Sequence, residues 1–167
     1  MARTVSVNIG SNIGNRRENL MRAVEEIGRI TGCHVRTSAI FESESWGYRS
    51  DNPFYNLEAE FESDLEAEQL LAIFKNIEKK MGSSTHRDAS GGYIDRKLDI
   101  DIIYIGSEVI SSGDLQVPHP RMQEREFVLR PLTELSPGWV HPLLHLTARE
   151  MLSRLLAVSY WRLVLRT

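Results

Sequence analysis

The order of strand and helix patterns in this 167-residue sequence predicts an α+β fold. We expect a ferredoxin-like β-α-β-β-α-β antiparallel sheet with helices on one face and extra C-terminal helices. Apolar residues alternate in four short runs, and two amphipathic helical patterns lie between them. With 41% hydrophobic residues, the chain can bury a core. We therefore predict one domain, residues 1–167, with its core at about 4–140 and a C-terminal helix and tail at 141–167.

The first half of the chain supplies a strand, a helix and two further strands. Residues 4–9 alternate as a strand, and the loop GSNIGN follows. Asn15, with Glu18 three residues later, is typical of a helix start, and the apolar stripe behind it continues to Gly32. Residues 34–44 are rich in β-formers, and residues 54–63 alternate again after a polar loop.

The second half adds a helix, a strand and shorter helical segments. Ser63 or Asp64 is expected to cap the second helix, which ends before Gly82. After a polar loop, residues 98–105 form a strand. The remaining segments are expected to be short helices around 122–125 and 127–135, a final helix from about 147 to 156, and a short strand or loose tail.

Composition and charge exclude several classes of function. A net charge of -3 and a pI of about 6.0 leave no basic footprint for nucleic acid. No apolar run approaches the ~18 residues of a membrane span. The single cysteine, Cys33, permits no internal disulfide, and the N-terminus has no secretory pattern. We expect a cytoplasmic protein that acts on small molecules without a membrane or nucleic-acid partner, as a monomer or weak dimer.

The segment RKLDIDII, residues 96–103, is the strongest candidate for catalytic chemistry. On a strand its apolar residues face the core, while Asp99 and Asp101 point together to the other face, with Cα atoms roughly 6.6 Å apart. Such carboxylates can reach two metal ions about 3.5–4 Å apart. The alternative is that both merely face water, although aspartate is depleted in strands and two on one face repel each other without a cation.

Basic residues flank this strand on both sides. Arg96 lies three residues before the first aspartate, and Arg121 and Arg125 follow His119 closely. An arginine fork donates two parallel hydrogen bonds to phosphate, and histidine can donate as well. Taken singly, each basic residue is expected to form a surface ion pair with a neighbouring glutamate. Beside a carboxylate pair, together they favour ATP with Mg²⁺.

Aromatic and amide side chains in the second polar loop and the strand after it indicate a surface for a flat ring. Trp46, Phe54, Tyr55 and Asn56 gather there. Aromatic faces stack on a heteroaromatic ring, and an amide fixes its orientation by hydrogen bonds. Alternation places Phe54 and Asn56 on one face and Tyr55 on the other. The alternative is that Phe54 is an ordinary core residue.

With these residues identified, the chain resembles the pterin pyrophosphokinases of folate synthesis, the 6-hydroxymethyl-7,8-dihydropterin pyrophosphokinase family. The matching pieces, in the family's order over roughly residues 4–140, are NIGSNIGNRRENL, FESESWG with NPFYN, IEKKMG, DRKLDIDIIYIG and VPHPRMQEREFVLRPL. The resemblance implies a ferredoxin-like core. It also implies transfer of the β,γ-diphosphate of ATP to the hydroxymethyl group of the pterin, leaving AMP.

The resemblance further implies roles for the phosphate and metal side of the site. Asp99 and Asp101 would hold two Mg²⁺ ions and, with Arg96 and Arg87, form the catalytic set. The residues implied for binding ATP, the co-substrate, are Arg96, Ile102 at the adenine, His119 and Arg125. Activation of the pterin hydroxyl by one metal ion, by Asp99 or by Asp101 stays open at this point.

For the pterin, the resemblance implies a sandwich between Phe54 and Phe127. Asn56 would hydrogen-bond the edge of the ring, and Ser43 and Trp46 would contribute largely through their backbone.

The loop SSTHRDASGGYIDR departs from the family pattern. Ser83 and Gly92 stand where arginines are often found, and Tyr93 replaces a tryptophan. Arg87 and His86 are the basic residues that remain in this loop to meet phosphate. Its glycines suit a mobile lid.

Two other functions remain open for this sequence. One is a non-catalytic ferredoxin-like module that binds a nucleotide or pterin. The other is a different Mg²⁺-dependent phosphotransferase on the same scaffold. Release of AMP, ADP or no product separates the three.

Overall fold

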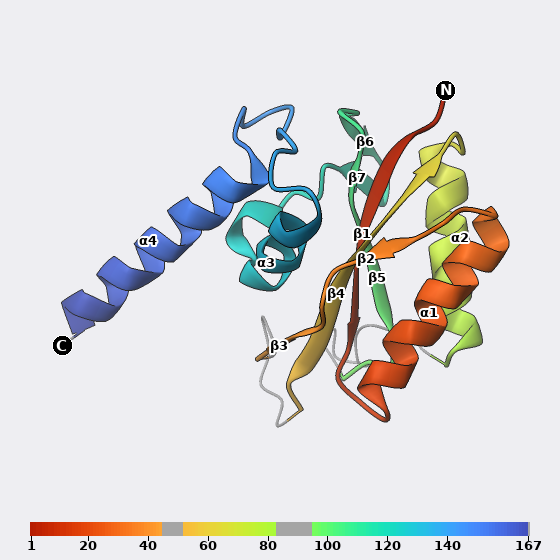
Figure 1. Cartoon of the computed structure of the whole chain (residues 1–167), viewed down its shortest axis with the longest axis horizontal. Coiled ribbons are helices and arrows are strands. Elements are labelled where there is room, and N and C mark those ends of the chain that lie inside the picture. The colour runs from red at the N-terminus through yellow and green to blue at the C-terminus, as the bar shows by residue number, and fades with distance from the viewer. Residues whose placement is uncertain (45–51, 83–94, 167) are drawn as a thin grey trace.

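The main sheet has five antiparallel strands, in a computed structural model that describes residues 1–44, 52–82 and 95–166, with side chains as far as Tyr160. The path is β2-β4-β1-β5, and β3 also pairs with β4 (Figure 1). The strands are β1 (Arg3–Ser11), β2 (Arg36–Thr37), β3 (Phe41–Ser43), β4 (Phe54–Ser63) and β5 (Asp99–Ile105). This order confirms the ferredoxin-like fold that the sequence predicts.

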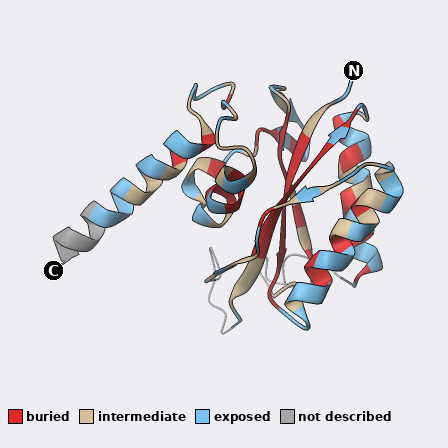
Figure 2. Cartoon of the chain, viewed as in Figure 1, coloured by how far each residue is buried: buried red, intermediate tan, exposed pale blue. Residues whose placement is uncertain are grey.

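Helices cover the two faces of the sheet unequally. α1 (Arg16–Thr31) and α2 (Ala67–Lys80) lie on one face, where an apolar core joins them to the strands. The 3-10 helix η1 (Met122–Glu124), α3 (Glu126–Leu135) and α4 (Ala148–Arg166) belong to the other side. Figure 2 shows burial concentrated in the strands and in the sheet-facing sides of α1, α2 and α3, while α4 extends away from the body. Among the helices that the structure describes, none has the length and apolar character needed to cross a bilayer.

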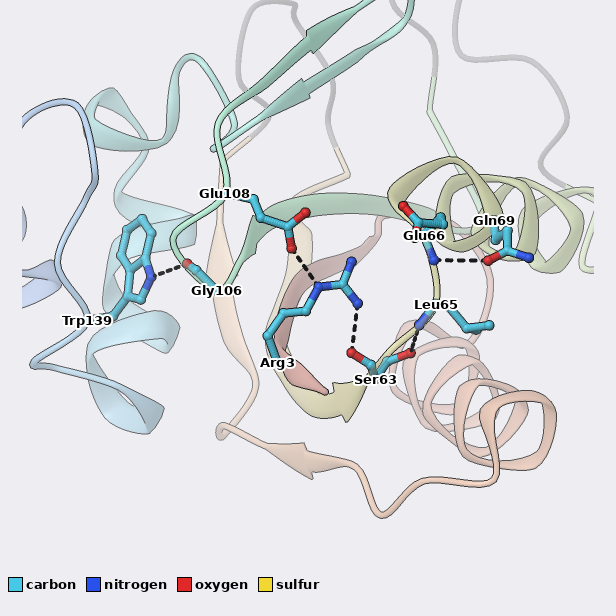
Figure 3. A network of polar contacts seen from close by, with 8 residues as sticks. All are labelled: Arg3, Ser63, Leu65, Glu66, Gln69, Gly106, Glu108 and Trp139. Atoms are coloured by element: carbon cyan, nitrogen blue, oxygen red, sulfur yellow. Dashed lines mark hydrogen bonds and ion pairs between the residues drawn. The ribbon is translucent and has the colours of Figure 1, made fainter. Parts of the chain in front are cut away.

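Local signals explain where α1 and α2 begin and end. Asn15 accepts a hydrogen bond from the Glu18 N–H at 3.1 Å, and Gly32 ends α1 with a φ of 70°, both as expected. The expected caps of α2 are wrong. Glu66 forms a capping box with Gln69, and the Ser63 hydroxyl accepts from the Leu65 N–H instead (Figure 3).

Three further segments differ from the sequence prediction. The β-rich stretch at 34–44 divides into β2 and β3, each only two or three residues long. A hairpin of β6 (Ile110–Ser112) and β7 (Leu115–Val117) was not predicted, because three-residue strands are too short to show alternation. α4 continues to Arg166 rather than ending near residue 156, so the final residues are neither strand nor loose tail.

A second apolar cluster fixes α3 and α4 beside β5. The Trp139 ring stacks on Tyr104 with centroids 4.1 Å apart, and its Nε1 donates to the Gly106 carbonyl at 2.9 Å (Figure 3). Around this pair pack Ile103, Met122, Val128, Leu129, Leu132, Ala148 and Met151. The cluster therefore positions α3 over the sheet face opposite to α1 and α2.

Candidate active site

Three cross-strand rows of mainly polar residues cross the sheet on the α3 side. The antiparallel register places one β1 residue between one residue of β4 and one of β5 in each row. The rows are Asn56–Gly10–Asp99, Glu58–Asn8–Asp101 and Glu60–Ser6–Tyr104. Directly opposed residues have Cβ atoms about 4.5–5.5 Å apart, so each row is a line of adjacent side chains.

The two aspartates share a face, as the sequence predicts. Ile100 and Ile102 are each 6% exposed in the core beneath α1 and α2, whereas Asp99 and Asp101 are half-buried on the other side. Asp99 Oδ2 accepts a hydrogen bond from Arg96 Nη1 at 2.8 Å. An arginine and a carboxylate pair therefore meet at the start of β5.

A β-bulge ends the regular alternation of β5 just past the aspartates. The register with β1 shifts between Ser6 and Val7, so that Ile102 pairs with Val7 and Tyr104 with Ser6. Ile103 is the extra residue, and it joins Tyr104 in the second apolar cluster. The bulge thus turns Tyr104, rather than an apolar residue, toward the third row.

Asn12 anchors the backbone of Arg96, three residues before Asp99. Its Oδ1 accepts from the Arg96 N–H at 2.6 Å, and its own N–H donates to the Arg96 carbonyl at 3.0 Å. Its Nδ2 donates to Asp95 Oδ1 at 2.8 Å. Sequence reasoning did not single out Asn12, although an amide in the GSNIGN loop is a signal for such a bond.

Glu78 of α2 holds the edge of β5 from the opposite side. Its Oε2 accepts from the Ile100 N–H at 2.8 Å, and the residue is only 6% exposed. By the two-residue period of a strand, the Ile102 N–H points to the same edge. Because the Ile102 side chain lies in the core, the implied contact with adenine can involve only its backbone.

His119 lies beside β5 as a neutral imidazole. The main-chain N–H of His119 donates to the Ile103 carbonyl at 2.8 Å. Burial, with the nearby charges of Arg125 and Arg121, lowers the pKa of its imidazole to about 4, although Asp99 opposes the shift. Its Nδ1 accepts from the Arg121 N–H at 3.2 Å, so the ring proton resides on Nε2, which can donate to phosphate at neutral pH.

The other arginines near His119 divide between the surface and the site. The Arg121 side chain is exposed and pairs with Glu124 at 3.2 Å, as the surface alternative predicts. Arg125 is half-buried, and its guanidinium carbon lies 5.6 Å from the centroid of the Phe127 ring. Arg125 therefore remains the better candidate for phosphate.

Gly10 allows Phe54 and Asn56 to lie across β1. A Cβ at this position would come within 2.7 Å of Asn56 Oδ1 and 3.4 Å of Phe54 Cδ1. Asn56 Nδ2 donates to Ser43 Oγ at 3.2 Å. Tyr55 turns to the other face, as predicted, and the half-buried Phe54 is not an ordinary core residue. The described part of the chain thus brings together three of the residues implied for the pterin.

Phe127, at the start of α3, is attached to the middle row. Its carbonyl accepts from Asn8 Nδ2 at 3.1 Å, and its ring is half-buried. Trp46 and Arg87 lie outside the described residues, as do Ser83, Gly92 and the other positions of their loops, so their implied roles stay predictions.

Two fully buried glutamates on β4 were missed by the sequence analysis. Glu58 is 0% exposed, with hydrogen bonds from Ser6 Oγ at 2.8 Å and Asn8 Nδ2 at 3.1 Å. Burial raises the pKa of its carboxyl to about 8 against those bonds, aided by the nearby charges of Glu60 and Asp101. Glu60 accepts from Tyr104 Oη at 2.7 Å. Alternation places both on this face but gives no signal that α3 covers it.

The donor set fits Mg²⁺ bound together with phosphate. Mg²⁺ commonly uses one or two carboxylates and completes its octahedral shell with water and substrate phosphates. Asp99 and Asp101 supply such a pair. Within the described ranges, no group of three or more His, Cys, Asp or Glu residues forms a protein-only metal cage.

Comparison with known proteins points in the same direction. The sequence model of the 7,8-dihydro-6-hydroxymethylpterin-pyrophosphokinase (HPPK) family matches residues 6–137. A 2-amino-4-hydroxy-6-hydroxymethyldihydropteridine pyrophosphokinase from Porphyromonas gingivalis is 36% identical over 83% of this chain and 93% of its own length. The enzyme of the same name from Aquifex aeolicus is 31% identical over 88% and 89%. A folic acid synthesis protein from Dictyostelium discoideum is 38% identical over 85% of this chain, which spans only 21% of that protein.

Solved structures share the fold at low sequence identity. A Plasmodium falciparum HPPK-DHPS with pterin and p-hydroxybenzoate has a TM-score of 0.74 at 14% identity, covering 97% of this chain and 44% of its own. The same protein with pteroate has a TM-score of 0.72 at 13% identity, covering 92% and 42%. This chain thus spans less than half of those chains.

Proposed function

Because this chain belongs to the 7,8-dihydro-6-hydroxymethylpterin-pyrophosphokinase family, we propose that it transfers the β,γ-diphosphate of ATP to 6-hydroxymethyl-7,8-dihydropterin. The products are AMP and the pterin diphosphate, and the reaction belongs to folate biosynthesis. One observation supports the proposal for this chain: the row Asn56–Gly10–Asp99 carries, on one face, the amide proposed to recognise the ring and a carboxylate proposed to bind metal.

The spacing in that row suits the substrate. Asn56 and Asp99 are separated by two interstrand steps, roughly 10 Å. A bicyclic ring held at Asn56 can therefore extend its one-carbon arm toward the carboxylates. Phe54 and Phe127 are the aromatic partners for the two ring faces, and the Ser43 hydroxyl helps to orient the Asn56 amide.

Asp99 and Asp101 would hold two Mg²⁺ ions, which would supply positive charge to offset that of the phosphates. The guanidinium of Arg96 lies beside Asp99, so it would contact the phosphates of ATP bound at this pair of aspartates. His119 would donate from Nε2 to a phosphate oxygen, and Arg125 would bring a second guanidinium to the phosphates. The backbone of Ile102 at the sheet edge is the contact left for adenine.

Catalysis by these residues is mainly positioning and charge neutralisation. Phosphoryl-type transfers leave little covalent work for the protein, whereas alignment of the alcohol with the phosphorus contributes a large part of the rate. The hydrogen bonds of Asn12 to Arg96 and of Glu78 to Ile100 hold the backbone around the aspartates during that alignment.

Product analysis tests the proposal. The protein is incubated with ATP, Mg²⁺ and the pterin alcohol, and the nucleotide products are separated. AMP with pterin diphosphate is the expected result. ADP would indicate the other phosphotransferase, and no turnover would indicate the binding module. A cytoplasmic location, a monomer or weak dimer, and contacts from Trp46 and Arg87 stay predictions of the sequence.

A further inference from the structure

Pro131 removes one main-chain hydrogen-bond donor from α3. In an α-helix, the carbonyl of each residue accepts from the N–H four residues later. Proline has no N–H, and Pro131 lies inside this helix. The carbonyl that loses its helical donor is that of Phe127, whose ring we assign to the pterin.

Asn8 supplies a donor to that carbonyl from the sheet. Its Nδ2 lies 3.1 Å from the Phe127 oxygen and 3.1 Å from Glu58 Oε1, so both amide hydrogens have acceptors. The residue is 4% exposed on the central strand β1, between Glu58 and Asp101 in the middle row. Ser6 Oγ donates to the other oxygen of Glu58 at 2.8 Å.

Within the residues that the structure describes, no side-chain hydrogen bond caps the start of α3. Arg125 occupies the N-cap position and makes no side-chain cap hydrogen bond. The first turn therefore depends on contacts with the sheet for its exact placement, and the Asn8 bond reaches it at Phe127.

We infer that Asn8 is a positioning residue, whose amide replaces the N–H that Pro131 lacks and sets the Phe127 ring beside the row of Asp101. The inference rests on the proposed function, because it requires that the Phe127 ring contacts a bound pterin. Asn8 affects pterin binding through its hydrogen bond to Phe127. No contact with ATP is assigned to Asn8, so we expect its loss to change the KM for the pterin and not the KM for ATP.

Asn8→Leu tests this inference, because leucine is similar in size and has no donor. We expect the KM for the pterin to rise about tenfold from the loss of the hydrogen bond to Phe127, with the KM for ATP unchanged. Amide exchange of Val128 and Leu129, in the first turn of α3, should accelerate. Ser6→Ala is the matched control, since it removes the other bond to Glu58 without touching Phe127. It should lower stability and leave both KM values unchanged.

Pro131→Ala provides the rescue, because alanine restores the N–H at position 131. In Asn8→Leu/Pro131→Ala, the KM for the pterin should return toward that of the parent, and amide exchange in the first turn should slow. A defect in Asn8→Leu that persists in the double variant, or that affects ATP equally, would overturn the inference. If the parent protein forms no AMP, the proposed function fails, and the exchange measurements alone decide whether Asn8 holds α3: unchanged exchange in Asn8→Leu rejects it.

Discussion

The two faces of the central sheet are built from the same strands and have opposite chemistry. On β1, Val5, Val7 and Ile9 point into the apolar core beneath α1 and α2. Ser6 and Asn8, between them, are equally inaccessible to solvent but point to α3. Burial is therefore not what distinguishes the faces. The face beneath α1 and α2 is mainly apolar, with a buried Asn19–Ser11 hydrogen bond at one end, whereas every row on the α3 face carries polar groups.

This difference separates stability from function. Burial of apolar area contributes roughly 25 cal/mol per Å², so the α1/α2 face is the main source of folding free energy. Buried polar groups cost free energy unless they are hydrogen-bonded, and their net contribution is small even then. A polar face maintained at that cost indicates a role other than stability, and here it carries the proposed metal ligands.

The largest expected difference between the faces is the activity of Asp101→Asn. AMP formation should fall at least about 10³-fold, because bound metal supplies several kcal/mol to the transition state, at about 1.36 kcal/mol per tenfold. The free energy of unfolding should not fall, because the substitution removes a charge close to Glu58. Product assays and denaturant unfolding measure the two effects. The same substitution at the exposed Asp64, Asp64→Asn, is the control. Near-normal turnover by Asp101→Asn would show that Asp101 does not bind the metal.

Phe74→Ala should show the reverse pattern on the apolar face. The side chain is fully buried in α2, with its ring edge against Phe61 at 6.3 Å between centroids. We expect a loss of about 3–5 kcal/mol in unfolding free energy from the transfer and cavity contributions. Both KM values should stay unchanged for the folded molecules. If the variant does not fold, Phe74→Leu provides a smaller cavity. A KM change at full folding would show that the faces are coupled.

The alternation of the sequence was sufficient to predict which side of β5 carries the aspartates. Ile100 and Ile102 require burial, so Asp99 and Asp101 had to point the other way. Alternation also separated Phe54 and Asn56 from Tyr55. It contains no information on register, however, and the pairing of Gly10 with Asn56 and Asp99 comes from long-range strand contacts.

The failures have equally specific causes. Glu58 and Glu60 have the spacing of a solvent-facing side, because a strand pattern cannot report that a helix far along the chain covers it. α4 exceeded its predicted end because its leucine, alanine and arginine residues favour helix over the few β-formers.

Glu58→Gln should change how stability depends on pH. A carboxyl near 4.5 in the unfolded chain and about 8 in the folded protein makes the folded state bind its proton more tightly. That stability is fully present below pH ~4.5 and is lost as the pH rises through ~8. Without Mg²⁺, the variant should therefore match the parent near pH 5 and exceed it by a few kcal/mol near pH 9, at about 1.36 kcal/mol per unit. Exposed Glu62→Gln is the control, and parallel pH profiles for Glu58→Gln and the parent would show that Glu58 is charged when folded.

Gly10→Ala should have the smallest effect and the most selective one. The new methyl group would displace the Asn56 amide, 2.7 Å away, while alanine itself suits a strand interior better than glycine. We expect about a tenfold higher KM for the pterin, the loss of a hydrogen bond, with the KM for ATP and the stability nearly unchanged. Gly28→Ala is the matched control on the apolar side, where the nearest atom is the Cys33 carbonyl oxygen at 3.4 Å. Equal effects on both substrates would mean that Gly10 merely supports the sheet. An effect confined to the pterin would mean that the ring is recognised across β1, through a residue that contributes no side chain.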